Sequence, residues 1–217
     1  AGNPQQLCRF EYLAGSSDYI RNSLVPRFSA LIEKLIGEPV FLFKDKCNLK
    51  RPGGGAFTPH QDVTAYRHFN TRYQVTAAIA LDLADRTNGA LEMAETWNAI
   101  PAGVPVLATP RGELAILPSY EGGRRNGDIV DDYTASIRWR RIDAKPGDVI
   151  LFDSYVPHRS EINRSSATRR LLFFTFNLAS EGNLYDLYYT EKRSRPANPI
   201  FHVATPTVHS GLNEATK

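Results

Sequence analysis

Histidine and carboxylate side chains at three positions of this chain could hold a metal ion. His60 and Asp62 stand two residues apart in Pro59-His-Gln-Asp62, and His158 lies far downstream, directly after Pro157. Two imidazoles and one carboxylate can occupy one face of an octahedral Fe(II) ion and leave the opposite face open for substrates. A structural metal site would close its coordination sphere instead. These residue types therefore indicate oxygen chemistry at an open iron site.

A pair of arginines follows the second histidine, at the start of an apolar segment. The segment Arg169-Arg-Leu-Leu-Phe-Phe-Thr-Phe-Asn177 is typical of a strand buried on both faces. A basic residue that enters such a strand requires an anionic partner, and a guanidinium can hold a carboxylate by two parallel hydrogen bonds. Because side chains alternate across a strand, one of Arg169 and Arg170 should face the interior and the other should face outward.

The motif His60-x-Asp62 has a simpler interpretation when it is taken alone. A histidine and a carboxylate two residues apart occur often by chance, and this pair could belong to a surface turn after Pro59. The preceding run Arg51-Pro-Gly-Gly-Gly-Ala-Phe-Thr-Pro59 favours a site, because its glycines let the backbone pass close to a bound group. In an extended backbone both side chains would point to the same side, so one strand end could supply two ligands.

Short apolar segments separated by turn signals predict a mainly β protein, either a sandwich or a jelly roll. The expected strands cover residues 40–50, 74–83, 90–93, 136–142, 149–152 and 171–177, with short strands or loops over 98–120. A helix is expected over 16–36, capped by Ser17 or Asp18, broken or kinked at Pro26 and ended by Gly37. A second helix is expected over 183–193, and the tail after Arg195 should run as an extended covering segment.

Three segments, in this order, resemble the phytanoyl-CoA dioxygenase family of Fe(II)/2-oxoglutarate-dependent oxygenases. They are residues 43–62, Asn88-Gly-Ala-Leu-Glu-Met93 and the segment 147–160, and the resemblance extends over about residues 40–192. It implies a double-stranded β-helix, which is a cupin-like jelly roll with flanking α-helices. We expect one domain over 1–217, with an N-terminal helical segment at 1–38, a jelly-roll core at 39–180 and a C-terminal helix and tail at 181–217.

The resemblance also implies roles for individual residues. His60, Asp62 and His158 would be the catalytic iron ligands, and Arg169 would hold the distal carboxylate of 2-oxoglutarate. The other expected contacts to this cosubstrate are Ser160, Asn48, Lys44 and Gln61. Four aromatic residues are expected near the substrate, namely Phe57, Tyr66, Trp97 and Tyr155. For Tyr66 and Trp97, ordinary packing is an equally good explanation. The chain departs from the family at 94–97, where Ala-Glu-Thr-Trp replaces a Pro-Gly-Ser-His stretch.

The predicted function is hydroxylation, or another oxidation, of an unactivated C–H bond. Fe(II), 2-oxoglutarate and O2 would be required, with release of succinate and CO2. The substrate is expected to be a small, polar or anionic molecule or a secondary-metabolite intermediate. The carboxylate of Asp62 argues against halogenation, because halogenating relatives have a small residue at this position. Two other interpretations stay open, namely a non-catalytic metal-binding jelly roll and a zinc-dependent hydrolase.

Composition excludes several other classes of protein. The chain has 26 basic and 23 acidic residues, a net charge of +3, and no long run of like charges, so no nucleic-acid partner is expected. No stretch of 18 apolar residues and no secretory signal pattern occurs. Two cysteines, Cys8 and Cys47, do not make a disulfide framework, which favours a reducing, cytoplasmic setting. The oligomeric state is left open.

Overall fold

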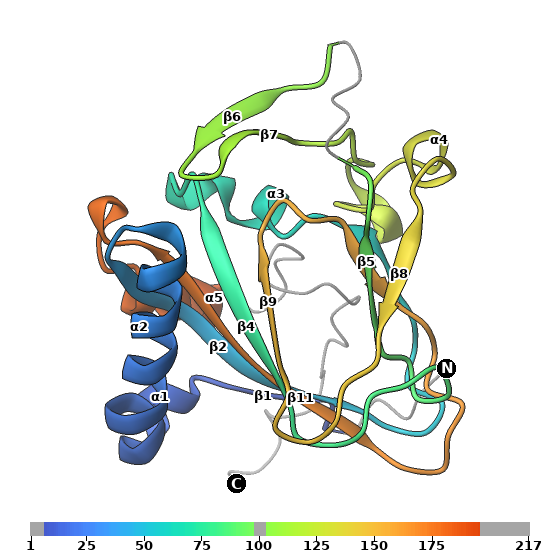
Figure 1. Cartoon of the computed structure of the whole chain (residues 1–217), viewed down its shortest axis with the longest axis horizontal. Coiled ribbons are helices and arrows are strands. Elements are labelled where there is room, and N and C mark those ends of the chain that lie inside the picture. Colours follow the sequence, from blue (N-terminus) through green and yellow to red (C-terminus); the bar gives the residue numbers. More distant parts are fainter. Residues whose placement is uncertain (1–6, 98–102, 196–217) are drawn as a thin grey trace, which may run out of the picture.

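Two antiparallel sheets form the body of the molecule in the computed structural model, which describes residues 7–97 and 103–195 (Figure 1). The larger sheet has the strand order β1-β2-β11-β4-β9 and the smaller one the order β3-β10-β5-β8. The strands of the larger sheet are β1 Arg9–Glu11, β2 Val40–Lys50, β4 Gln74–Ala80, β9 Val149–Asp153 and β11 Arg169–Leu178. Those of the smaller sheet are β3 Phe57–His60, β5 Leu91–Ala94, β8 Trp139–Ile142 and β10 His158–Ser160.

A separate hairpin and several helices surround the sheets. The hairpin consists of β6 Val106–Thr109 and β7 Gly112–Ala115. The α-helices are α1 Leu13–Ser16, α2 Val25–Ile36, α3 Val63–Tyr66, α4 Asp131–Thr134 and α5 Tyr185–Ser194. A π-helical turn covers Ile20–Leu24, and 3-10 turns cover Arg67–Phe69, Gly123–Arg125 and Ala179–Glu181. No helix in the described ranges has the length and apolar character needed to cross a membrane.

The N-terminal helical region differs in detail from its prediction. Instead of one helix over 16–36, the structure has α1, a π-helical turn and α2 in succession. Pro26 lies in the first turn of α2, where its missing N–H costs nothing because that amide has no partner inside the helix. Gly37 ends α2 as predicted: its φ is 79° and its N–H donates to the Glu33 carbonyl.

Most strands were predicted at the correct place, with shorter or shifted ends. Strand β2 has the predicted bounds Val40–Lys50. The strand predicted over 136–142 begins only at Trp139, because α4 and the turns after it occupy the residues before. Within 98–120 the structure describes β6 and β7, whereas residues 98–102 and the tail from 196 onward lie outside the described residues.

The two faces of β11 have different tasks. On the outer face, Phe174 and Phe176 are almost completely buried in a cluster with Ile32 of α2, and the ring of Phe28 stacks on Phe174 at 5.6 Å. Helix α2 therefore covers the outer face of the larger sheet, where it is visible beside β2 in Figure 1. The inner face, which includes Arg169, is left to line the space between the sheets.

Candidate metal centre and cosubstrate pocket

Three potential metal ligands lie close together at the end of β3, the start of β10 and the start of α3. His158, the first residue of β10, pairs directly with His60, the last residue of β3, and their ring centroids are 4.2 Å apart. Asp62 follows at the N-cap position of α3 with φ −62° and ψ −31°. One ligand atom from each of the three side chains lies within 4.8 Å of the other two. The expectation of an extended strand through both His60 and Asp62 was wrong, since the strand ends at His60.

Both imidazoles are oriented by backbone carbonyls. The Nδ1 atom of His60 is 2.7 Å from the Thr58 carbonyl oxygen, and the Nδ1 atom of His158 is 3.0 Å from that of Val156. Because a carbonyl only accepts, each Nδ1 must carry the proton and donate it. The Nε2 lone pair of each ring is then free for a metal ion, and the Nδ1 hydrogen bond fixes the orientation of the ring. Two neutral imidazoles and one carboxylate thus suit a divalent cation.

Asp62 is ionised although it is buried. Burial alone would raise the pKa of its carboxyl group, but the charge of Lys44, and at low pH that of protonated His158, outweighs this effect and holds that pKa well below its usual range. The hydroxyl of Tyr66 donates to Asp62 Oδ1 over 3.4 Å. The centre therefore offers one negative and two neutral ligands at neutral pH.

The titration of the histidines predicts a pH dependence of the metal-free protein. Burial, and after it the neighbouring His60, lower the pKa of His158 to about 4, against an ordinary value of about 6.5. As the pH falls from about 6.5 to about 4, the unfolded chain takes up a proton that the folded chain does not, so the free energy of unfolding decreases. We expect a loss of about 3 kcal/mol across this window, on top of the contributions of other groups.

Urea unfolding of the metal-free protein at several pH values between about 7 and about 4.5 measures this effect. The variant His158→Gln, which cannot titrate at this position, is the control and should show a shallower decline. An equal decline in both proteins would contradict the assignment of the slope to His158.

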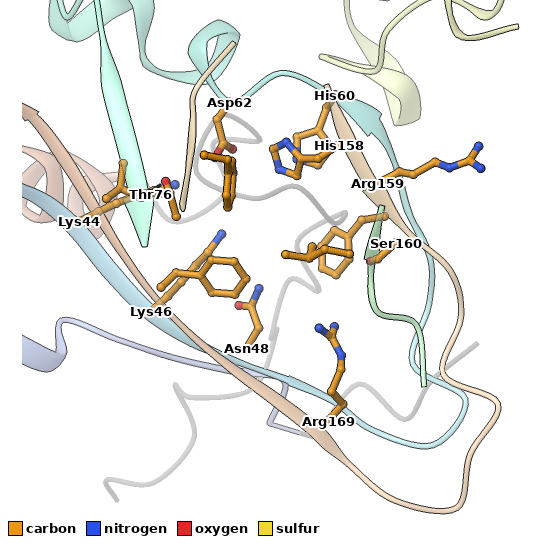
Figure 2. A pocket seen from close by; sticks show the side chains of 15 residues that line it. Lys44, Lys46, Asn48, His60, Asp62, Thr76, His158, Arg159, Ser160 and Arg169 are labelled. Carbon is orange, nitrogen blue, oxygen red and sulfur yellow. Dashed lines mark hydrogen bonds between the residues drawn. The ribbon is translucent and has the colours of Figure 1, made fainter. Parts of the chain in front are cut away.

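A pocket lies between the two sheets beside the three ligands, with about 530 Å³ of empty space when its opening to solvent is included (Figure 2). Its floor is formed by the larger sheet, namely the inner faces of β2, β11 and β4 with β9 at the edge, and its other wall by the smaller sheet and the start of α3. The floor residues are Lys44, Lys46, Asn48, Thr76, Phe152, Arg169, Phe173 and Thr175. The remaining lining residues are Phe57, His60, Asp62, Leu91, His158, Arg159 and Ser160.

Arg169 points into this pocket and Arg170 points away from it. Arg169 is only 3% exposed, and its Nε and Nη1 atoms have no hydrogen-bond partner within the described part of the chain. Arg170 is exposed and forms two hydrogen bonds of 2.8 Å to the carboxylate of Asp82. The predicted inward and outward orientations are confirmed. A buried guanidinium with two unused donors fits a carboxylate group of a cosubstrate.

Ser160 is connected to a lysine that sequence reasoning missed. The Nζ atom of Lys50 donates to Ser160 Oγ over 2.8 Å and also to the Glu161 carbonyl. Burial, and next the charge of Arg169, lower the pKa of Lys50 to about 7. Lys50 could have been found from the sequence, because it continues the alternation of polar residues along β2. The pair fixes the hydroxyl of Ser160 beside the pocket.

The Asn88–Gly89 turn closes over this lysine from outside the pocket. Gly89 has φ 73°, and a Cβ atom there would lie 2.2 Å from the carbonyl oxygen of Glu161 and 3.0 Å from Lys50 Nζ. No side chain fits at these distances, so glycine is required both for the backbone conformation and for the close approach.

Asn48 and Lys44 line the pocket as expected from their face of β2. The Oδ1 atom of Asn48 accepts a 3.0 Å hydrogen bond from Arg9 Nε, which directs the Nδ2 donor into the pocket (Figure 2). Lys44 Nζ lies 4.2 Å from the ring centroid of Tyr66. Lys46, two residues further, also lines the pocket. The floor therefore presents donors and positive charge.

Gln61 does not lie on the pocket, contrary to the expectation that it contacts the cosubstrate. Its amide Nε2 donates to the carbonyls of Ala115 and Tyr155 at 3.0 and 2.5 Å, and its Oε1 accepts from Leu117 N at 2.7 Å. The side chain is 1% exposed. The turn from β3 into α3 rotates Gln61 away from its two neighbours and toward β7. It is a structural residue that fixes this turn.

Gln61→Glu tests this correction. The substitution replaces the donor to two carbonyls with an acceptor, so a buried cluster of acceptors would remain without hydrogen atoms. We expect a decrease of about 3 kcal/mol in the free energy of unfolding and an unchanged affinity for 2-oxoglutarate in the fraction that folds. Urea unfolding and a 2-oxoglutarate titration measure the two effects. A large loss of affinity in a stable variant would restore the original expectation.

Of the four aromatic residues expected near the substrate, Phe57 lines the pocket and the other three do not. Tyr155 is fully buried in the core, and its hydroxyl donates to the Arg72 carbonyl at 2.5 Å. Tyr66 lies behind Asp62 and supports it. Trp97 is partly buried against two core clusters. Tyr66 and Tyr155 are thus near the ligands in sequence, and Trp97 follows β5, but core packing directs Tyr155 and Trp97, and Tyr66 acts through Asp62.

The facing sheets define a double-stranded β-helix protein, and the His-Asp-His cluster between them could hold a metal ion. A comparison with known families agrees, because the family model described as phytanoyl-CoA dioxygenase (PhyH) matches residues 9–171. The chain belongs to this family.

Curated relatives include two enzymes named for small phosphonates. The chain is 33% identical to 2-aminoethylphosphonate dioxygenase from uncultured bacterium HF130_AEPn_1 over 87% of this chain and 66% of the relative. It is 36% identical to methylphosphonate hydroxylase from Gimesia maris over 73% of this chain and 54% of that protein. The chain thus spans about half to two thirds of the lengths of these relatives.

Solved structures confirm the predicted fold. EctD from S. alaskensis with 2-oxoglutarate and 5-hydroxyectoine has a TM-score of 0.61 and 18% identity, over 83% of this chain and 60% of EctD. The non-heme alpha ketoglutarate dependent carbocyclase SnoK from nogalamycin biosynthesis also has a TM-score of 0.61, with 17% identity, over 82% of this chain and 66% of SnoK.

Proposed function

We propose that this chain is the catalytic domain of an Fe(II)- and 2-oxoglutarate-dependent dioxygenase that hydroxylates a C–H bond of a small polar or anionic molecule. The observation that carries the proposal is Arg169. A guanidinium with two unused donors lies in the same pocket as the three ligands, and this combination serves a metal ion that works with a carboxylate cosubstrate.

Within this proposal each residue has a defined task. His60, Asp62 and His158 hold the iron on one side, while Arg169 and Ser160 bind the far carboxylate of 2-oxoglutarate, with Asn48 as a further donor. Bound Fe(II), 2-oxoglutarate and O2 would supply the oxidising power for C–H hydroxylation: one oxygen atom would enter the substrate, the other would enter succinate, and CO2 would be released from 2-oxoglutarate. The apolar side chains of Phe57, Leu91, Phe152 and Phe173 exclude water from the pocket, and its floor positions the target bond.

The named phosphonate relatives support a small anionic substrate for this chain. The cationic floor of the pocket supports the same class of substrate, because Lys44, Lys46 and Arg169 all lie on it. A long acyl chain would instead require an apolar channel, which these basic side chains do not provide.

The test is spectroscopic and then catalytic. Anaerobic addition of 2-oxoglutarate to the Fe(II)-loaded protein should produce a metal-to-ligand charge-transfer band, and O2 should then lead to succinate. Iron binding without this band would favour the non-catalytic metal-binding protein. Hydrolytic activity with zinc in air-free buffer, indifferent to 2-oxoglutarate, would favour the hydrolase.

A further inference from the structure

The pocket floor has two cationic ends. Along β2 and β11 the register pairs Lys50 with Arg169, Lys46 with Phe173 and Lys44 with Thr175. Lys50 is six positions after Lys44 along β2, which corresponds to about 20 Å of strand. Figure 2 shows Lys44 beside Thr76 at one side of the pocket and Arg169 below, with Lys46 and Asn48 between them. A cosubstrate with its far carboxylate on Arg169 therefore leaves the Lys44 end for another ligand.

The ammonium groups at this end have no anionic partner in direct contact. Among residues 7–97 and 103–195, neither Lys44 nor Lys46 forms a hydrogen bond or an ion pair, and each lies over an aromatic ring instead. By contrast, the Nε atom of Arg159, another cation of the pocket wall, is 2.6 Å from the Glu92 carboxylate. Burial lowers the pKa of Lys44 to about 8, and burial together with the neighbouring Lys44 lowers the pKa of Lys46 well below its ordinary value. A bound anion would keep both amino groups in the charged form.

Asp45, which stands between the lysines in the sequence, cannot neutralise them. Alternation along β2 places its side chain on the opposite face. There its carboxylate accepts hydrogen bonds from the backbone N–H groups of Leu13 and Ala14, at 2.8 and 2.7 Å, and from the Tyr185 hydroxyl at 3.0 Å. The one carboxylate of the described pocket lining is Asp62, which the metal centre uses.

A count of charges defines the missing ligand. When both lysines are protonated, Lys44, Lys46 and Arg169 carry three positive charges and Fe(II) adds two, whereas Asp62 and the 2-oxoglutarate dianion supply three negative charges. Two positive charges remain. Lys50 is left out of this count because it is bonded to Ser160 and to the Glu161 carbonyl and does not line the pocket.

We propose that the Lys44–Lys46 end of the pocket binds a dianionic, tetrahedral head group of the substrate, either a phosphonate or a phosphate monoester. Two ammonium groups supply point charges that suit such an oxyanion. The hydroxyls of Thr76 and Thr175 lie 2.9 Å apart. Since one of them donates to the other, one hydroxyl hydrogen is left as a further donor. The inference rests on the proposed function and specifies its substrate.

Calorimetry with methylphosphonate tests the site, both with the metal-free protein and with the anaerobic Fe(II)–2-oxoglutarate complex. Methanesulfonate has the same shape but a single charge, and we expect it to bind at least about tenfold more weakly. Lys44→Met and Lys46→Met should each weaken methylphosphonate binding by about tenfold or more and leave 2-oxoglutarate affinity within about threefold. Lys145→Met, in the turn before β9, is the matched control and should change neither affinity.

The stability of the metal-free variants gives an independent readout. Lys46→Met removes a half-buried amino group whose charge repels Lys44, so the Tm should rise, whereas replacing a purely structural lysine would lower the Tm. Equal binding of the sulfonate, or an equal loss of 2-oxoglutarate affinity in the lysine variants, would overturn the proposal.

Comparison of 2-aminoethylphosphonate with a small phosphate monoester separates the two sources of the head group. Loss of methylphosphonate binding to metal-free Lys44→Met and Lys46→Met would support the site even if the wild-type iron complex showed no 2-oxoglutarate band. In that case the reaction class, and not the anion site, would have failed.

Discussion

Replacing Asp62 by Ala is expected to weaken Fe(II) binding by more than about 100-fold and to abolish oxygen-dependent formation of succinate. Asp62 is the single carboxylate among the three ligands. Without it, the site consists of two neutral imidazoles near the charges of Lys44 and Lys46, which repel a divalent cation. His60→Ala should have the same result, because it removes a ligand at the same centre.

Iron content after anaerobic loading and a succinate assay measure the two effects of Asp62→Ala. Asp132→Ala is the control, because Asp132 is exposed on α4 and its removal should change neither quantity. Normal iron affinity together with lost activity would show that Asp62 acts in another way than as a ligand.

Arg169→Ala is expected to raise the dissociation constant of 2-oxoglutarate by about 30- to 100-fold while Fe(II) binding persists. The variant removes the buried donors Nε and Nη1, which have no partner within the described chain. The carboxylate of the cosubstrate would then be desolvated without a counter-charge. Titration of the charge-transfer band measures the affinity, and iron content shows that the metal centre is intact.

Arg170→Ala is the matched control, since it removes the same side chain from the other face of β11. It breaks a salt bridge to Asp82 that is exposed to solvent, which should cost no more than about 1 kcal/mol of stability. The affinity for 2-oxoglutarate should stay the same. The opposite result, with Arg170→Ala as the defective variant, would place the cosubstrate elsewhere.

Local patterns were sufficient for the elements that carry the site. The run of residues in β2 has a proline before it and a glycine-rich turn after it, so its bounds follow from the sequence. The alternation of β11 places Arg169 and Arg170 on opposite faces of the strand, because successive side chains point to opposite sides. The same period of two could have identified Lys46 and Lys50, which were not predicted as site residues.

The failures concern residues whose partners are distant in the sequence. Gln61 was expected to contact the cosubstrate, yet its partners are Ala115, Leu117 and Tyr155. Nothing near Gln61 in the sequence predicts the approach of these residues. Tyr155 and Trp97 were placed at the pocket because they are close to it along the chain, whereas their directions are set by core packing.

Gly89 restricts which positions can be varied in a redesign of this pocket, although Gly89 does not itself line the pocket. Alanine there would collide with the Glu161 carbonyl and press on Lys50, so a change that lies outside the cavity would displace the hydroxyl of Ser160 inside it. Libraries intended to alter substrate preference should therefore leave position 89 unvaried. Diversity is better introduced at Thr76, Leu91 and Thr175, whose side chains line the cavity and do not fix the Lys50–Ser160 pair.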